Sequence, residues 1–176
     1  HPPHAGRTHE LSRRSLRPRI RGLHPSPKVA DDDAALLDLI QEDIEERYLD
    51  SEGKWQFQSD KAWDAIHRCL TNGRLEYGTG PYPLAYAVLG GEPLYNGDDY
   101  IVVLVRPEHV AATALALASV TKEWLRQQYM AIDATDYGLT LSDDDFEYTW
   151  SNFEGLPEFF ATAAAAGRPV VFTADQ

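Results

Sequence analysis

The chain has 176 residues, of which 43% are hydrophobic and 11% aromatic, and its formal net charge at pH 7 is −12. This composition is typical of one globular domain with a real core, and no apolar run approaches the roughly 20 residues of a membrane helix. A single cysteine excludes an internal disulfide and fits a reducing compartment, so we expect a cytoplasmic protein that makes no use of a membrane.

The first 30 residues are basic and rich in proline. Seven Lys and Arg against one Glu give this segment a charge of +6, so the remainder of the chain carries −18. With five prolines and hardly any aliphatic periodicity, the segment cannot bury enough apolar surface to order itself. We therefore expect residues 1–30 to be a disordered, flexible tail and residues 31–176 to be one folded domain.

The folded part is expected to begin with a helix at Asp31, where three consecutive aspartates favour the positive end of the helix dipole. Residues 55–57 alternate apolar and polar side chains, as a short strand does. A central helix follows, with Ser59 as its N-cap and Asn72 and Gly73 at its end. A tryptophan and a histidine, Trp63 and His67, share its inward stripe.

A short helix is predicted to start at Pro83 and to end at Gly90 and Gly91. The residues that follow, Glu92 and Pro93, indicate an abrupt turn. Turns of this kind often lie at the edge of a pocket.

The second half begins with a strand. Residues 100–105 form a continuous run rich in β-branched side chains, as in a strand that is buried on both faces. Two helices are expected next, starting at Pro107 and Thr121. Leu139, Thr140 and Leu141 indicate a short strand.

The last elements have clear start and stop signals. Ser142 and Asp145 form a capping box for another helix, and a final helix opens at Pro157 and closes at Gly167. Residues 169–173 are a predicted strand, which we expect to pair with the strand at 100–105. The fold class is therefore α+β, with several helices packed around a small mixed β-sheet.

Two segments of this chain resemble a known family. They are Asp60-Lys61-x-Trp63-x-x-x-His67-x-x-Leu70-Thr71 and Pro83-Leu84-x-x-Ala87-Val88-Leu89-Gly90-Gly91-Glu92-Pro93-Leu94. The chain is similar here to the YfbM-like family, a bacterial domain of unknown function. The resemblance implies an α+β domain, several helices around a small mixed sheet, and no established activity. Family members usually begin with a short strand, and in this chain the basic tail occupies that place, around residues 20–23.

His67 is the main catalytic candidate. It could act as a general acid or base if the turn at Gly90 and Gly91 brings Glu92 to it, because histidine titrates near working pH and needs an orienting partner. The competing interpretation is a buried histidine that bonds to the backbone beside Trp63. The lone cysteine, Cys69, faces away from His67 on an ideal helix and is interpreted as a buried structural residue.

Aromatic residues cluster around the two segments that resemble the YfbM-like family, which we call the signature segments. A pocket lined by Trp63, His67, Tyr82, Tyr86 and Glu92 would suit a small amphipathic or cationic ligand. The alternative is that these rings are ordinary core and loop packing. No metal-ligand spacing, phosphate loop or dinucleotide fingerprint occurs in the sequence, so we expect neither a metal nor a cofactor.

The favoured function is a soluble, non-enzymatic binding or protein-interaction domain. The strong negative charge would steer a basic protein partner, as in small acidic inhibitor or immunity proteins. The alternative is an enzyme of unknown reaction that uses a pocket formed by His67 and Glu92. Binding of nucleic acid through the tail is not favoured, because short basic runs are weak motifs and the −18 body opposes it.

Overall fold

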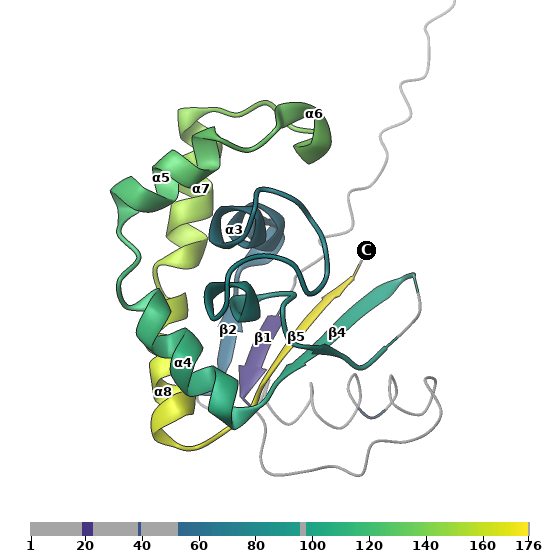
Figure 1. Cartoon of the computed structure of the whole chain (residues 1–176), viewed down its shortest axis with the longest axis vertical. Coiled ribbons are helices and arrows are strands. Elements are labelled where there is room, and N and C mark those ends of the chain that lie inside the picture. The colour runs from purple at the N-terminus through teal and green to yellow at the C-terminus, as the bar shows by residue number, and fades with distance from the viewer. Residues whose placement is uncertain (1–18, 23–38, 40–52, 96–97, 176) are drawn as a thin grey trace, which may run out of the picture.

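The computed structural model describes residues 19–22, 39, 53–95 and 98–175. These residues form one α+β domain, with helices packed on a small sheet (Figure 1). The strands are β1 (Arg19–Gly22), β2 (Gln56–Gln58), β3 (Glu92–Pro93), β4 (Tyr100–Val105) and β5 (Val170–Asp175). The α-helices are α3 (Trp63–Leu70), α4 (Pro107–Leu117), α5 (Lys122–Met130), α6 (Ala134–Tyr137), α7 (Asp143–Phe153) and α8 (Leu156–Ala165), and two 3-10 turns are η2 (Asp60–Ala62) and η3 (Leu84–Ala87). No helix in this part of the chain is long and apolar enough to cross a membrane.

The described strands form one sheet in the order β2-β1-β5-β4-β3, and every pairing between them is antiparallel. The expectation of a mixed sheet is therefore wrong for these strands. Its two long strands explain why: Val105, the last residue of β4, pairs with Val170, the first residue of β5. The intervening helices return the chain to the end of the sheet that it left, so β5 must run back along β4.

The predicted pairing of the two long strands is confirmed, and their side chains alternate as an antiparallel sheet requires. Ile101, Val103 and Phe172 belong to the main core beneath the helices, whereas Val102 and Val171 are buried on the other face. In Figure 1 the labelled helices lie on one side of the strands, with α3 between the sheet and the helices α5 and α7. This central place makes α3 the element from which the candidate site is built.

Strand β1 lies inside the segment that was expected to be a flexible tail. Residues 19–22 pair with β5 and residues 19–21 also pair with β2, which corrects that expectation for these four residues. Backbone pairing supplies the order that the basic side-chain composition did not indicate. The rest of residues 1–30, and the helix predicted from Asp31, lie outside the described residues.

Several predicted boundaries are confirmed. Thr121 and Ser142 cap α5 and α7, because their side-chain oxygens accept the backbone N–H groups of Trp124 and Asp145 at 3.1 Å. The prediction of a strand at residues 139–141 is wrong. These residues connect α6 to α7 and Leu139 is 56% exposed, since the described sheet edges are formed by β2 and β3 instead.

Ser59 was expected to cap the central helix with its side chain, and this is also corrected. Ser59 precedes η2 but makes no capping hydrogen bond, and its hydroxyl is buried. Instead, the Tyr148 hydroxyl of α7 accepts the Lys61 N–H at 3.2 Å and donates to Asp60 Oδ2 at 2.8 Å. The Tyr148 hydroxyl of α7 therefore holds the start of η2. Asp60, the first residue of η2, has a left-handed backbone with φ of 45°.

Gly90 and Gly91 allow close backbone packing where the signature segment ends. A Cβ atom on Gly90 would lie 2.4 Å from the Ala85 carbonyl oxygen, and one on Gly91 would lie 2.4 Å from the Leu104 carbonyl oxygen. The Gly90 N–H donates to that same Ala85 oxygen at 2.8 Å. Glycine at these two positions therefore allows the turn to pack directly on the backbone of η3 at Ala85 and of β4 at Leu104, where a side chain would have no room.

We expect Gly90→Ala to lower the free energy of unfolding by about 2 kcal/mol, because overpacking against backbone cannot be relieved by a rotamer change. The control is Gly167→Ala. Gly167 has φ of 63° and open space around a Cβ, so it reports backbone strain alone, at about 1 kcal/mol. Chemical denaturation measures both variants. An equal or smaller loss for Gly90→Ala would show that the backbone can move aside.

Candidate functional site

Helix α3 carries the polar side chains of the candidate site. His67 is 0% exposed and Arg68 only 4% exposed, although the same helix packs Ile66 and Leu70 in the main core. Charged residues are almost never buried to this degree unless they are paired. The partners of Arg68 and His67 therefore define what this region of the molecule can do.

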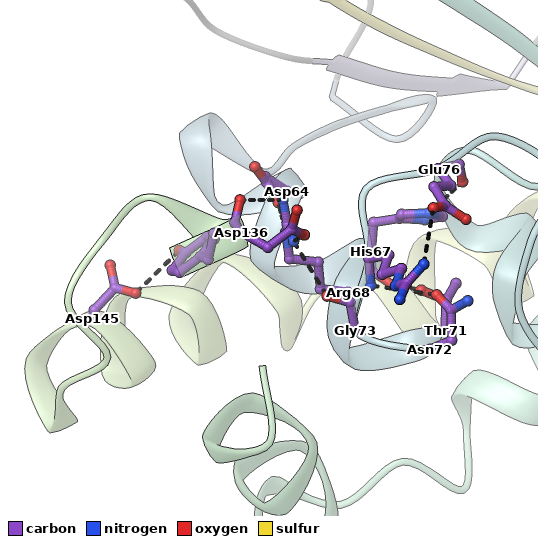
Figure 2. A network of polar contacts seen from close by, with 11 residues as sticks. Asp64, His67, Arg68, Thr71, Asn72, Gly73, Glu76, Asp136 and Asp145 are labelled. Carbon is purple, nitrogen blue, oxygen red and sulfur yellow. Dashed lines mark hydrogen bonds and ion pairs between the residues drawn. The ribbon is translucent and has the colours of Figure 1, made fainter. Parts of the chain in front are cut away.

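Arg68 lies between two carboxylates. Its Nε donates to Asp64 Oδ1 at 2.5 Å, one turn earlier in α3, and its Nη1 donates to Asp136 Oδ2 of α6 at 2.5 Å. The guanidinium also donates to the carbonyl oxygens of Gly73 and Asp136, at 3.2 and 3.3 Å (Figure 2). These contacts fasten α3 to α6 and to the loop that follows α3.

The charges of this group are set by burial and by one another. Burial lowers the pKa of Arg68, but the hydrogen bonds with Asp64 and Asp136 outweigh burial, so the net shift is upward and the guanidinium stays charged. Burial also raises the pKa of Asp64 and outweighs the opposing effect of Arg68. Loss of one partner in such a buried arrangement leaves an uncompensated charge, which is more costly than loss of the whole pair.

Two tyrosines extend this network to α5 and α7. The Arg68 guanidinium lies 5.5 Å from the centre of the Tyr137 ring, within cation–π range. The hydroxyls of Tyr137 and Tyr129 both donate to Asp145 Oδ2, at 3.1 and 2.6 Å. Burial, together with the Asp145 carboxylate, raises the pKa of both tyrosines, so both hydroxyls remain protonated donors. Four helices thus meet around one polar network.

A pocket of about 350 Å³ opens beside Arg68. It is lined by Asn72–Glu76, which follow α3, by Ala131 and Asp133, which precede α6, and by Arg68 and Asp136. This volume is at the lower end of the range for ligand sites. The pocket therefore combines a buried ion-paired arginine with exposed carboxylates and backbone carbonyls.

His67 is a core histidine with one backbone partner. Its Nε2–H donates to the Glu76 carbonyl oxygen at 3.1 Å (Figure 2), whereas Nδ1 is buried and has no hydrogen-bond partner among the residues that the structure describes. The pKa of His67 is lowered to about 4, chiefly by burial; the hydrogen bond to the Glu76 carbonyl opposes this shift and the nearby charge of Arg68 adds to it. His67 is therefore neutral at pH 7 and fixes the loop after α3.

The structure does not bring His67 and Glu92 together. Glu92 is 49% exposed and accepts two hydrogen bonds from the Arg106 guanidinium, at 2.5 and 3.1 Å. The general acid–base pair that the sequence suggested has no geometric support, because each residue is held by a different partner. The competing interpretation, a buried histidine bonded to backbone, agrees with the contacts of His67.

The aromatic residues of the predicted pocket divide between two places. Trp63 packs on Phe172 of β5, with ring centres 5.6 Å apart. Tyr82 and Tyr86 instead contact His109 of α4, and the Tyr82 hydroxyl lies 3.1 Å from His109 Nδ1. Their ring-to-ring contacts therefore do not place them in the pocket beside Arg68.

Sequence reasoning missed Arg68, Asp136 and the loop residues around Glu76. The spacing of Asp64 and Arg68, four residues apart on one helix, was an available signal for an ion pair. Asp136 lies 68 residues from Arg68, and no local pattern connects them. Cys69 was interpreted as a buried structural cysteine, and its 1% exposure confirms this; burial raises the pKa of its thiol to about 12.

Comparisons with known proteins agree on a family and on a fold. The family described as "Domain of unknown function (DUF1877)" matches residues 26–173. Among solved structures, a protein of unknown function, YfbM from Escherichia coli, is 21% identical with a TM-score of 0.57, and the alignment covers 90% of this chain and 99% of that one. No curated protein matches the chain. At this identity the structural likeness shows the fold alone.

Proposed function

The chain belongs to the DUF1877 family, described only as a domain of unknown function, and from this premise we propose that it is a non-enzymatic binding domain that docks a basic protein partner through exposed carboxylates. The YfbM-like resemblance seen in the sequence is confirmed by both comparisons. Neither comparison assigns an activity or a partner.

The proposal rests on the excess of acidic over basic residues and on the ion pairs that occupy most of the basic ones. Between residues 53 and 175 there are eight Lys and Arg against 17 Asp and Glu. Five of the eight form ion pairs with carboxylates; they are Arg68, Arg74, Arg106, Lys122 and Arg126. Few cations are left to balance the remaining acids, so an approaching basic surface would meet a negative field.

Three exposed carboxylates lie at the starts of α6 and α7. Asp133 and Asp144 are exposed, and Asp143 is 75% exposed where it pairs with Arg126. Two apolar side chains of the same region, Met130 and Leu139, are 45% and 56% exposed. Interfaces combine apolar contact with a polar rim, and charge complementarity mainly raises the association rate. An inhibitor or immunity role against a basic protein would be one form of such binding.

We expect the triple variant Asp133→Asn/Asp143→Asn/Asp144→Asn to lose a partner that the unmodified protein retains. The experiment is affinity capture at low and high salt, followed by mass spectrometry. The partner should be a protein of high isoelectric point whose capture falls as salt rises, because screening weakens exposed charge interactions. Asparagine keeps the capping role of Asp133, so the variant should remain folded.

The matched control removes the same charge elsewhere. Glu108, Glu154 and Glu158 are exposed, and Glu154 lies beyond the opposite end of α7. Glu108→Gln/Glu154→Gln/Glu158→Gln should retain the partner. Equal loss in both triple variants would show a dependence on net charge without a defined surface, and absence of any basic partner would overturn the proposal.

A further inference from the structure

The pocket beside Arg68 has a buried part, the Arg68 guanidinium, which we call its floor, and two exposed carboxylates, those of Glu76 and Asp133, which we call its rim. Arg68 is 4% exposed, and its guanidinium donates four hydrogen bonds to oxygen atoms of the protein, which hold it in place. His67 fixes the loop that carries Glu76, through the hydrogen bond from Nε2 to the Glu76 carbonyl.

The rim retains unused capacity to accept hydrogen bonds. One oxygen of the Asp133 carboxylate accepts the Thr135 N–H at 2.8 Å, and no described residue donates a hydrogen bond to its second oxygen. The Glu76 side chain is 46% exposed, and among the described residues its carboxylate pairs with Arg74 at 3.7 Å; Arg74 is itself 69% exposed. So long and exposed an ion pair contributes little and is easily exchanged for a better one.

The charges of the pocket favour a cation. The positive charge of Arg68 is offset by two carboxylates, Asp64 and Asp136, before the rim is counted. Glu76 and Asp133 then add two negative charges to the lining against the one positive charge of Arg74. The pocket lining holds three carboxylates and two guanidiniums, an excess of one negative charge, and Asp64, which pairs with Arg68 outside the lining, adds a second.

We propose that this pocket binds an arginine side chain of the basic partner, an inference that rests on the proposed function and assigns its anchoring site. A guanidinium offers five donors in a planar fork, which can reach a carboxylate and neighbouring oxygens at once. Leu75, 38% exposed, and Ala131 supply apolar surface for the methylene stem. Buried arginines are frequent anchors at the centre of protein interfaces.

The test uses a small probe in place of the unidentified partner. N-acetyl-arginine amide carries the side chain with both ends blocked, and N-acetyl-citrulline amide is its uncharged analogue. Titrated into the full-length 15N-labelled protein, the arginine probe should shift backbone amide resonances of residues 72–76 and 131–136 in a saturable way. The citrulline probe should bind at least about tenfold more weakly, because its urea group forms no ion pair.

Two matched variants locate the effect. Glu76→Gln/Asp133→Asn should weaken the arginine probe by about tenfold, whereas Glu154→Gln/Glu158→Gln removes equal charge outside the pocket lining and should leave its affinity within about twofold. Shifts scattered over the surface, equal binding of citrulline, or no saturable shift would each overturn the inference.

These outcomes are separate from those of the capture experiment. If a basic partner is captured but the probe does not bind at the pocket, the proposed function stands and the arginine anchor is wrong. If the probe binds as expected but no basic partner exists, the proposed function fails, and the pocket is a site for a small guanidinium compound.

Discussion

Replacing Arg68 with methionine should lower the free energy of unfolding by about 3 kcal/mol, the largest loss that we expect from a single substitution. Methionine keeps the length and apolar character of the stem but leaves Asp64 without its partner in a site where Arg68 was 4% exposed. Asp136 is 55% exposed and can return to water, which keeps the value at the low end for broken buried pairs. Urea denaturation at pH 7 measures the loss.

Two further variants test the cause. Arg106→Met breaks an ion pair in which both side chains are about half exposed, and it should cost less than about 1 kcal/mol. Adding Asp64→Asn and Asp136→Asn to Arg68→Met should restore part of the stability, because no unpaired buried carboxylate then remains. A loss for Arg68→Met no greater than that for Arg106→Met would contradict a structural role for the buried pair.

Lowering the pH from 6.5 to 4 should destabilise the protein by roughly 3 kcal/mol through His67 alone. The unfolded chain takes up a proton on this histidine at its ordinary pKa of about 6.5, whereas burial holds the folded pKa at about 4. Between these values the unfolded state binds more protons, so stability rises with pH, and it falls as the pH decreases. Well below pH 4 both states are protonated and this contribution no longer changes.

His67→Gln removes the titrating group and tests this prediction. The variant loses stability of its own, but the difference in its free energy of unfolding between pH 6.5 and 5 should be smaller than for the unmodified protein. NMR provides a direct check, because the His67 imidazole should remain neutral at pH 5.5. An imidazole that titrates with an ordinary pKa would show that water reaches it and would return His67 to the catalytic candidates.

The sequence predicted most local structure correctly. The start of α4, the caps of α5 and α7 and the strands β2, β4 and β5 follow from side-chain periodicity and from residues whose backbone preferences act within a few positions. The strand predicted at residues 139–141 failed because a strand needs a partner edge, and three alternating residues carry no information about one. The flexible tail failed at β1 for the converse reason, since pairing ordered a segment of unfavourable composition.

The candidate site could not be predicted in the same way. His67 was recognised as an inward-facing histidine, but its partner is the backbone carbonyl of Glu76, and a carbonyl leaves no mark in a sequence. Glu92 was expected to reach His67 if the turn at Gly90 and Gly91 brought it there, yet it pairs with Arg106, the residue that follows β4. Proximity in the signature did not imply contact between side chains.

The sequence by itself therefore determined the helices α3, α4, α5, α7 and α8, the two long strands and the family, because capping residues and side-chain periodicity act between near neighbours. Only the tertiary structure decided that Arg68 meets Asp136, that the described sheet is wholly antiparallel, and that Glu76 and Asp133 border one pocket. Each of these depends on the path that the chain takes through the helices between β4 and β5. That path is set by the packing of the whole core and not by any local run of residues.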